Sequence, residues 1–363
     1  MYFKTEQRIC GGKRPAATEG TLNQRFLSMG EHDMSKEQVL TLLRSAGDGY
    51  LSGEKMSEIL GVSRTAVWKD IEGLRQDGYQ IESQTRRGYR LISAPNRLSR
   101  GEILPWLHSE RTKENLIVLD TVDSTNTYAK QLGMKNGADG TAVAANEQTG
   151  GRGRLGRSFL SPKDTGIYLS VLYRPDIPPM DAVNLTSYVA VAVCDGIEAA
   201  CGVRPGIKWT NDIVLGSRKL AGILTEMSVE GETGTLQYIV TGIGLNVLQR
   251  EEDFPPELRS SATSLQIELG RPVSRGRIAA EVLNALDVMH QCWLDGGGDY
   301  LQQYRKDCLT VGKEVRLIRP GGERTAFAEG IDTDFGLIVR YPDGSRETIT
   351  SGEVSVRGLE GYA

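Results

Sequence analysis

A run of alternating glycines and arginines is the part of this 363-residue chain that best suits chemistry: Gly150-Gly151-Arg152-Gly153-Arg154-Leu155-Gly156-Arg157. Glycines let backbone N–H groups come close to an anion, because no side chain stands in the way. The arginines add permanently charged, fork-shaped donors that match a carboxylate or a phosphate. The run therefore predicts a phosphate-binding loop, with a flexible solvated loop as the alternative.

Two common nucleotide-binding patterns fit this run poorly. Gly151, Gly153 and Gly156 have the spacing of a dinucleotide fingerprint, which needs a strand before it and a helix after it. A strand is expected at residues 142–145, but residues 158–162 (Ser-Phe-Leu-Ser-Pro) do not favour a helix. The chain also lacks the G-x-x-x-x-G-K-[ST] pattern of P-loop ATPases. A dinucleotide-binding domain and a P-loop ATPase are therefore both disfavoured.

Lys208 is the second group suited to chemistry. It lies near the end of an expected strand at residues 206–209, just before Asn211 and Asp212. A lysine in this position can point into a cleft and neutralise the charge that develops between a carboxylate and an α-phosphate. The alternative is an ordinary solvated lysine at the end of a strand.

Three further segments carry polar groups or glycines where a ligand would come close. Ser124, Thr125 and Asn126 lie at the start of an expected helix at residues 125–132. They act as a helix N-cap, contact a small polar ligand, or do both. Residues 219–224 and 242–246 are apolar with glycines inside them. Glycine within a strand often marks the close approach of a ligand or of another backbone, although core packing explains it equally well.

The elements that must position these residues fall into separate regions. Residues 1–33 are expected to be a disordered extension or a mis-annotated start. Residues 34–95 predict a winged helix-turn-helix. Its third helix is capped by Ser63 and runs to about Gln76, and a basic hairpin follows at residues 78–92.

Residues 98–308 predict a catalytic domain with a mixed or antiparallel sheet, because several strands follow one another without an intervening helix. The expected strands lie at residues 116–119, 142–145, 167–172, 206–209, 213–215, 221–225 and 238–244. The expected helices lie at residues 125–132, 182–200 and 275–294. Residues 311–363 hold short strands at 314–318, 324–331, 336–340 and 346–350, and their spacing predicts a small SH3-like β-barrel. The fold class is therefore α+β and multidomain.

The third helix of the first region has the features of a DNA-recognition helix. Its exposed face begins with Arg64, Thr65, Trp68 and Lys69, and Arg86 and Arg87 in the hairpin are suited to phosphate contacts. Residues 34–100 contain 11 Lys and Arg against 8 Asp and Glu, a local net charge of +3, whereas the whole chain has a net charge of -4. DNA binding is therefore expected to rest on a local patch. A winged helix that only contacts another protein is the alternative.

Composition limits the remaining possibilities. The hydrophobic fraction of 39% and the charged fraction of 25% are those of a globular protein. The five cysteines form no C-x-x-C pair and the three histidines are scattered, so we expect unpaired thiols and no protein-held metal. No apolar run approaches the ~18 residues of a membrane span, and no signal peptide begins the chain. A cytoplasmic protein is expected.

Taken together, the motifs resemble those of the biotin–protein ligase family, in its bacterial form fused to a winged-helix repressor. They occur in one order: Ser124-Thr125-Asn126, Gln148 with Gly151-Arg152-Gly153-Arg154, Lys208-Trp209-x-Asn211-Asp212, Lys219-Leu220-Ala221-Gly222-Ile223 and Gly244-x-Asn246. The resemblance covers about residues 35 to 360, and five motifs in order are far more specific than any one of them. It implies a class II synthetase-like central domain. Phe159 departs from the pattern, because tryptophan is common there.

The resemblance implies an ATP-dependent, AMP-forming biotin–[acetyl-CoA-carboxylase] ligase that works in two steps. Biotin and ATP give biotinyl-5'-AMP and pyrophosphate, and the acceptor lysine of a biotin carboxyl carrier protein then attacks the mixed anhydride. The same resemblance implies Mg²⁺ with the ATP, operator DNA as a partner, and a homodimer promoted by the adenylate. The alternatives are a lipoate–protein ligase and a non-catalytic, biotin-sensing transcription factor.

The resemblance also implies a role for individual residues. The implied catalytic residues are Lys208, Arg152 and Arg154. The implied biotin-binding residues are Ser124, Thr125, Asn126, Gln148, Gly151, Arg152, Arg154, Lys208, Gly242 and Gly244. The implied adenylate- and ATP-binding residues are Arg154, Arg157, Phe159, Lys208, Asn211, Asn246 and Arg357.

Overall fold

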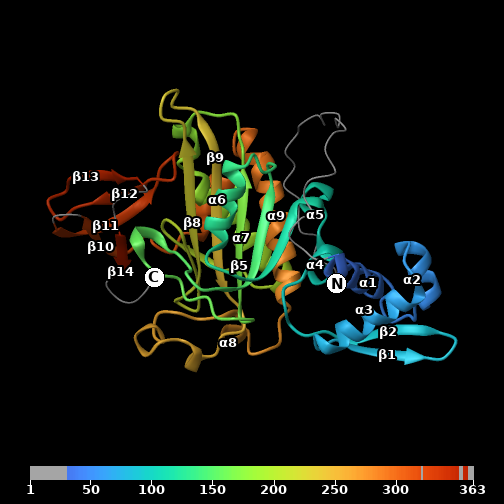
Figure 1. The fold of residues 1–363 in the computed structure, drawn as a ribbon. Coiled ribbons are helices and arrows are strands. Elements are labelled where there is room, and N and C mark those ends of the chain that lie inside the picture. The colour runs from blue at the N-terminus through green and yellow to red at the C-terminus, as the bar shows by residue number, and fades with distance from the viewer. Residues whose placement is uncertain (1–30, 320–321, 351–354, 359–363) are drawn as a thin grey trace. The chain divides into compact units, whose positions relative to one another are not determined.

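The structure is a computed structural model that describes residues 31–319, 322–350 and 355–358, with side chains described for residues 36–319 and 322–350. The chain forms two compact units that divide between Trp106 and Leu107 (Figure 1). Most of the expected N-terminal extension, residues 1–30, lies outside the described residues. Residues 31–33 form the start of helix α1 (Glu31–Ser45), so this helix begins before the expected boundary at residue 34.

The first unit contains the expected winged helix. Its main elements are α1, α2 (Gly53–Leu60), α3 (Arg64–Gln76) and the hairpin of β1 (Gln80–Gln84) and β2 (Gly88–Ser93). The Ser63 side chain caps α3, since it accepts a hydrogen bond from the Ala66 N–H at 3.1 Å. The apolar faces of the helices and the hairpin meet in one core: Val39, Leu40, Leu43, Met56, Val67, Ile71, Leu74, Tyr79 and Ile81.

This unit extends past the expected boundary at residue 95. A short helix, α4 (Arg100–Ile103), follows the hairpin and packs against α1. The Glu37 carboxylate accepts from the Gly101 N–H, and Arg44 forms an ion pair with Glu102. These contacts attach the segment that was expected to be a linker to the winged helix. A helix of only 4 residues is too short to show an apolar period in the sequence, so α4 was not expected.

The second unit is organised around a mixed sheet with the strand order β3-β4-β5-β9-β8-β7-β6. Strands β3 and β4 are parallel, and the other neighbours are antiparallel, as expected for this region. The strands are β3 (Leu116–Val122), β4 (Thr141–Gln148), β5 (Gly166–Tyr173), β6 (Gly206–Lys208), β7 (Asp212–Leu215), β8 (Arg218–Val229) and β9 (Leu236–Asn246).

Helices cover both faces of this sheet, and every residue of β5 is consequently buried. On one face Leu172 packs in the cluster that contains Ala129 of α6 (Thr125–Met134). The next residue along the strand, Tyr173, points the other way and stacks on His290 of α9 (Arg275–Leu294), with ring centroids 4.7 Å apart. Helix α7 (Leu185–Cys201) packs against α9.

Helix boundaries differ from expectation at several places. Helix α7 begins at Leu185 rather than residue 182, because residues 179–182 form a separate 3₁₀ turn with Pro179 at its start. Helices α5 (Glu110–Asn115), α8 (Leu265–Leu269) and α10 (Tyr300–Asp307) were not expected. Each is short, so its apolar period spans too few turns to stand out in the sequence.

The C-terminal domain is an antiparallel sheet with the strand order β13-β12-β11-β10-β14. Its strands are β10 (Glu314–Arg319), β11 (Gly322–Ile331), β12 (Leu337–Arg340), β13 (Arg346–Ile349) and β14 (Ser355–Gly358). The four expected strands are present, and β14 pairs with β10 as an additional edge strand. The multidomain α+β fold class is thus confirmed.

The described residues contain no helix long and apolar enough to cross a membrane. Cys194, Cys201 and Cys308 are free thiols, as expected. Cys292 is disulfide-bonded, so the expectation of unpaired thiols is wrong at this position.

Candidate active site

An open pocket lies over the central sheet of the second unit. Its empty volume is about 470 Å³, which includes open solvent at its mouth. Six segments line it: the start of α6 (Ser124, Thr125, Asn126), the end of β4 (Gln148), the glycine-rich loop with Phe159 (Arg152, Gly153, Arg154, Phe159), the β6–β7 turn (Asn211), strand β8 (Lys219, Gly222, Ile223, Leu224) and strand β9 (Gly242, Ile243, Gly244). The pocket therefore collects most of the motifs found in the sequence.

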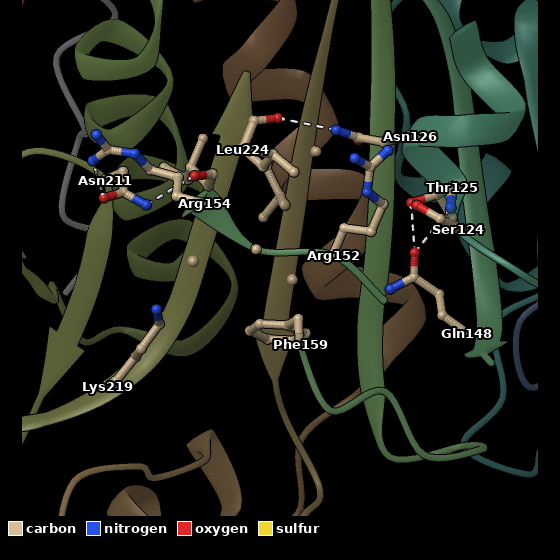
Figure 2. A pocket seen from close by; sticks show the side chains of 16 residues that line it. Ser124, Thr125, Asn126, Gln148, Arg152, Arg154, Phe159, Asn211, Lys219 and Leu224 are labelled. Carbon is tan, nitrogen blue, oxygen red and sulfur yellow. Dashed lines mark hydrogen bonds between the residues drawn. The ribbon is translucent and has the colours of Figure 1, made fainter. Parts of the chain in front are cut away.

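Neutral hydrogen-bonding groups make up one end of the pocket (Figure 2). The Gln148 Oε1 accepts from both the backbone N–H and the hydroxyl of Thr125, at 2.8 and 3.1 Å. Ser170 on β5 donates to the Thr125 hydroxyl at 2.8 Å. Ser124 caps α6 through the Thr127 N–H, so both interpretations of this segment hold at once, cap and pocket lining.

Glycines on β9 leave the space that two neighbouring side chains occupy. A Cβ on Gly242 would lie 2.1 Å from Asn126 Oδ1, and a Cβ on Gly244 would lie 2.5 Å from the Phe159 ring. Asn126 in turn donates to the Glu226 carboxylate at 2.9 Å. The close approach expected from glycines inside a strand is therefore present, and the groups that approach are the protein's own side chains.

The glycine-rich loop folds back on itself and no helix follows it. The Phe159 N–H donates to the Gly151 carbonyl at 2.9 Å, and the chain reverses at residues 154–156, with Leu155 and Gly156 at positive φ. The glycine at position 156 suits this reversal because its φ is 74°. This geometry excludes the strand–loop–helix unit that a dinucleotide fingerprint needs.

The two arginines of this loop lie differently. Arg154 donates from Nη1 to the Asn211 Oδ1 at 3.0 Å. Asn211 is fixed in turn by its own bond to the Ile223 carbonyl at 2.9 Å. Burial lowers the pKa of Arg154, and the nearby Asp212 carboxylate opposes that shift. Arg152 also lines the pocket, is about half exposed and lies 3.7 Å from the Glu226 carboxylate.

Lys219 is the lysine whose side chain lines this pocket, and the role expected of Lys208 stays a prediction. Lys208 is only 7% exposed and does not line the pocket, whereas Lys219 does (Figure 2). Lys219 Nζ lies 2.6 Å from Asp212 Oδ1. Sequence reasoning noticed the segment 219–224 but assigned its lysine no role. The feature of the sequence that indicates Lys219 is a lysine near the start of a strand, followed three residues later by Gly222.

Three other expected site residues whose side chains are described do not line the pocket, and a fourth, Arg357, has no described side chain. Asn246 is buried and is used within the protein, because it donates to the Thr263 carbonyl at 3.0 Å and accepts from Gln249. Gly151 packs against Phe159, and Arg157 is exposed. Arg357 belongs to β14, where the side chains lie outside the described residues.

A second candidate site lies on the first unit. Arg64, Thr65, Trp68 and Lys69 are all exposed on α3, while the opposite side of this helix forms the core. Arg86 and Arg87 are exposed at the tip of the β1–β2 hairpin. The Arg87 guanidinium lies 4.2 Å from the centre of the Tyr50 ring, a cation–π contact that helps to hold it. The arrangement suits a recognition helix flanked by a basic wing.

Comparison with protein families matches all parts of this architecture. Residues 118–246 match the biotin/lipoate A/B protein ligase family, residues 35–90 match an HTH domain, and residues 310–357 match the biotin protein ligase C-terminal domain. The chain is 38% identical over 313 residues to the bifunctional ligase/repressor BirA of Bacillus spizizenii, which covers 86% of this chain and 96% of that protein.

More distant relatives agree. The chain is 31% identical over 318 residues to the bifunctional ligase/repressor BirA of Escherichia coli, covering 87% of this chain and 95% of that protein. A solved structure of biotin protein ligase from Aquifex aeolicus in complex with biotin and ATP matches with a TM-score of 0.57 and 30% identity. That match covers 67% of this chain and 99% of the other.

Proposed function

This chain belongs to the biotin protein ligase family, in the form that combines a ligase with a repressor, and on that premise we propose how its residues divide the work. The chain is an ATP-dependent biotin–[acetyl-CoA-carboxylase] ligase and a DNA-binding repressor. Biotin's carboxylate attacks the α-phosphate of ATP, which gives biotinyl-5'-AMP and pyrophosphate. The lysine amine of an acceptor protein then attacks the mixed anhydride, and AMP leaves.

The observation that supports the residue roles is the polarity of the pocket from end to end. Neutral donors and acceptors (Ser124, Thr125 and Gln148) suit the uncharged, hydrogen-bonding head group of biotin at one end. Arg154 and Lys219 suit the carboxylate and the α-phosphate at the other end. Adenylation needs positive charge where negative charge develops and needs no nucleophilic side chain. We therefore assign the transition-state lysine to Lys219, with Arg152 turning in from the pocket mouth.

The remaining assignments extend this proposal. Phe159 covers Gly244 and would exclude water from the anhydride, which hydrolyses readily. Gly151, Arg157, Asn246 and Lys208 are not among the lining residues and are proposed to act from around the pocket, and Arg357 is proposed to face the adenylate. The described residues contain no group of three or more His, Cys, Asp or Glu that could hold a metal ion. Mg²⁺ would therefore bind mainly through the phosphates of ATP.

Pyrophosphate exchange tests the ligase activity and its substrate together. We expect the purified protein to exchange labelled pyrophosphate into ATP when biotin is present, and to show no exchange with lipoate or without an added acid. Exchange with lipoate instead would make the protein a lipoate–protein ligase. Biotin binding without exchange, by folded protein, would make it a biotin-sensing transcription factor.

The wing provides a prediction for DNA binding. An Arg87→Ala variant removes one exposed cation that we assign to a phosphate, so the slope of log K against log salt should become shallower by about 0.9. Base preference should stay unchanged, because phosphate contacts carry no sequence information. A salt titration of operator binding measures this slope. Lys306→Ala, which removes an exposed cation of the other unit, serves as the control; equal slopes for all three proteins would remove Arg87 from the interface.

We further propose that the acceptor is a biotin carboxyl carrier protein and that the adenylate promotes a homodimer. Two winged helices related by a twofold axis reach both halves of a palindromic operator, which one copy cannot do. Because it acts on ATP and operator DNA, the protein would work in the cytoplasm. Sedimentation with and without biotin and ATP tests the dimer, and an unchanged mass would contradict it.

A further inference from the structure

One turn of the C-terminal domain presents a buried aromatic side chain to the catalytic domain. The turn joins β11 to β12 at residues 332–336, and the Asp332 carboxylate closes it by accepting from the Asp334 and Gly336 N–H groups at 2.9 and 2.7 Å. Phe335 within it has a φ of 62°, a left-handed conformation that is uncommon for a large side chain. Although it lies at the tip of a turn, Phe335 is only 4% exposed.

The Phe335 side chain is buried among aromatic residues of two catalytic-domain helices. Its ring centre lies 5.0 Å from that of Tyr188 on α7 and 5.2 Å from that of Tyr304 on α10, the latter in an edge-to-face arrangement. Its carbonyl accepts a hydrogen bond from the indole N–H of Trp209 at 2.9 Å. The turn therefore contacts the catalytic domain through both its ring and its backbone.

Trp209 belongs to the β6–β7 turn, which is held from this same side at two more points. The Trp209 N–H donates to the Thr310 hydroxyl at 2.9 Å, and the Tyr304 hydroxyl donates to the Thr210 carbonyl at 3.3 Å. Thr310 lies between α10 and the C-terminal domain. The next residue of this turn, Asn211, lines the pocket, and Asp212 after it begins β7.

Those next two residues hold the charged groups of the pocket. Asn211 accepts from Arg154 at 3.0 Å, and Asp212 pairs with Lys219 at 2.6 Å. Trp209 and Thr210 of this turn thus contact the C-terminal side of the domain, while Asn211 and Asp212 contact two of the three pocket cations, Arg154 and Lys219. Displacement of such groups by about 1 Å can lower a rate by about 10²-fold.

We propose that Phe335 is a positioning residue for adenylation. Seated between Tyr188 and Tyr304 and bonded to Trp209, it holds the β6–β7 turn so that Asn211 and Asp212 keep Arg154 and Lys219 in place. The inference rests on the roles proposed above for these two cations. The C-terminal domain thereby contributes to the first step of the reaction without contacting biotin or ATP.

Truncation of the ring tests this directly. Phe335→Ala should lower kcat/KM for ATP in biotin-dependent pyrophosphate exchange by about 10²-fold, while Phe335→Leu, which refills much of the volume, should recover most of the loss. Trp209→Phe, which removes the indole donor together with some buried ring volume, should fall between them. Phe327→Ala is the matched control. Phe327 lies on β11 of the same domain, where its ring packs beneath Arg340. Its truncation should leave kcat/KM for ATP at the wild-type value.

A double-mutant cycle separates positioning from general destabilisation. In an Asn211→Ala background one of the two groups that Phe335 positions is already lost, so adding Phe335→Ala should cost less activity than it does in the wild type. Full additivity would overturn the proposal, and so would a Phe335→Ala enzyme with wild-type kinetics. Should Phe335→Ala fail to fold, the cycle of Trp209→Phe with Asn211→Ala decides the matter in the same way.

Hydrogen exchange gives a readout that does not depend on turnover. Phe335→Ala should speed exchange of the Ile223 amide, which donates to the Asn211 carbonyl, and Phe327→Ala should leave it unchanged. Equal exchange in both variants would overturn the proposal even in an active enzyme. Faster exchange at Ile223 in a protein that shows no biotin-dependent exchange of pyrophosphate would uphold the positioning contact and reject the proposed function instead.

Discussion

Replacing Lys219 by alanine should lower the rate of biotin-dependent pyrophosphate exchange by about 10²- to 10³-fold, or roughly 2.7–4 kcal/mol of transition-state stabilisation. Lys219 lines the pocket, and its ammonium group is held 2.6 Å from the Asp212 carboxylate. A fixed cation is worth most where charge develops away from bulk water, because no solvent has to reorganise around it. Single-turnover adenylate formation measures the loss without interference from the transfer step.

Two variants make this prediction specific to Lys219. Lys135→Ala, which removes an exposed lysine at the end of α6, should keep the wild-type rate. Lys208→Ala should cost less than Lys219→Ala, because Lys208 does not line the pocket. If Lys208→Ala proves the more damaging of the two, the assignment made from the sequence is the right one and ours is not.

Replacing Arg154 by lysine should lower kcat/KM for adenylation by about 10²-fold even though the charge is kept. The guanidinium can donate to Asn211 with one nitrogen and to a ligand oxygen with the others, whereas an ammonium is a point charge on a flexible stem. Steady-state kinetics at varied biotin and varied ATP will show which substrate loses the contact. Most of the loss should appear with ATP, because Arg154 lies at the charged end of the pocket.

The control for this substitution is Arg250→Lys. Arg250 is exposed and pairs only weakly with Glu252 at 3.8 Å, so the same chemical change there should leave the kinetics unaltered. Asn211→Ala should reproduce part of the Arg154→Lys defect, since it removes the partner that orients the guanidinium. Full activity in both Arg154→Lys and Asn211→Ala would show that the reaction needs neither the guanidinium of Arg154 nor its hydrogen bond to Asn211.

Local patterns in the sequence predicted the longer helices, most strands of the sheets and several parts of the site. The apolar period of Val67, Ile71 and Leu74 together with the Ser63 cap specified α3, because both signals act within a few residues of chain. Glycines at 242 and 244 marked the pocket floor, since no other residue leaves space there for Asn126 and Phe159. The order of motifs was sufficient to identify the family.

Only the tertiary structure shows that Lys219 lines the pocket. Strands β7 and β8 pair with a register shift, so that Ile213 lies opposite Ala221 but Val214 lies opposite Lys219, and Leu220 has no partner. Such a bulge reverses the faces of all residues beyond it, and no alternation in the sequence announces it. Sequence reasoning chose Lys208 from its place at a strand end, where the direction of the side chain was unknown.

The same limit applies to every contact between distant segments. Asn246 ends strand β9, which contains glycines, at a place where a ligand-binding residue is expected. Its side-chain amide is instead hydrogen-bonded to Thr263 and Gln249. Phe335 and Trp209 are 126 residues apart and meet only because the C-terminal domain docks beside α7 and α10. The sequence by itself determined most of the elements, the family and the chemistry, because these depend on residue type and short spacing. The tertiary structure decided which groups share the pocket, because that depends on strand register and domain docking, which arise from packing across the whole chain.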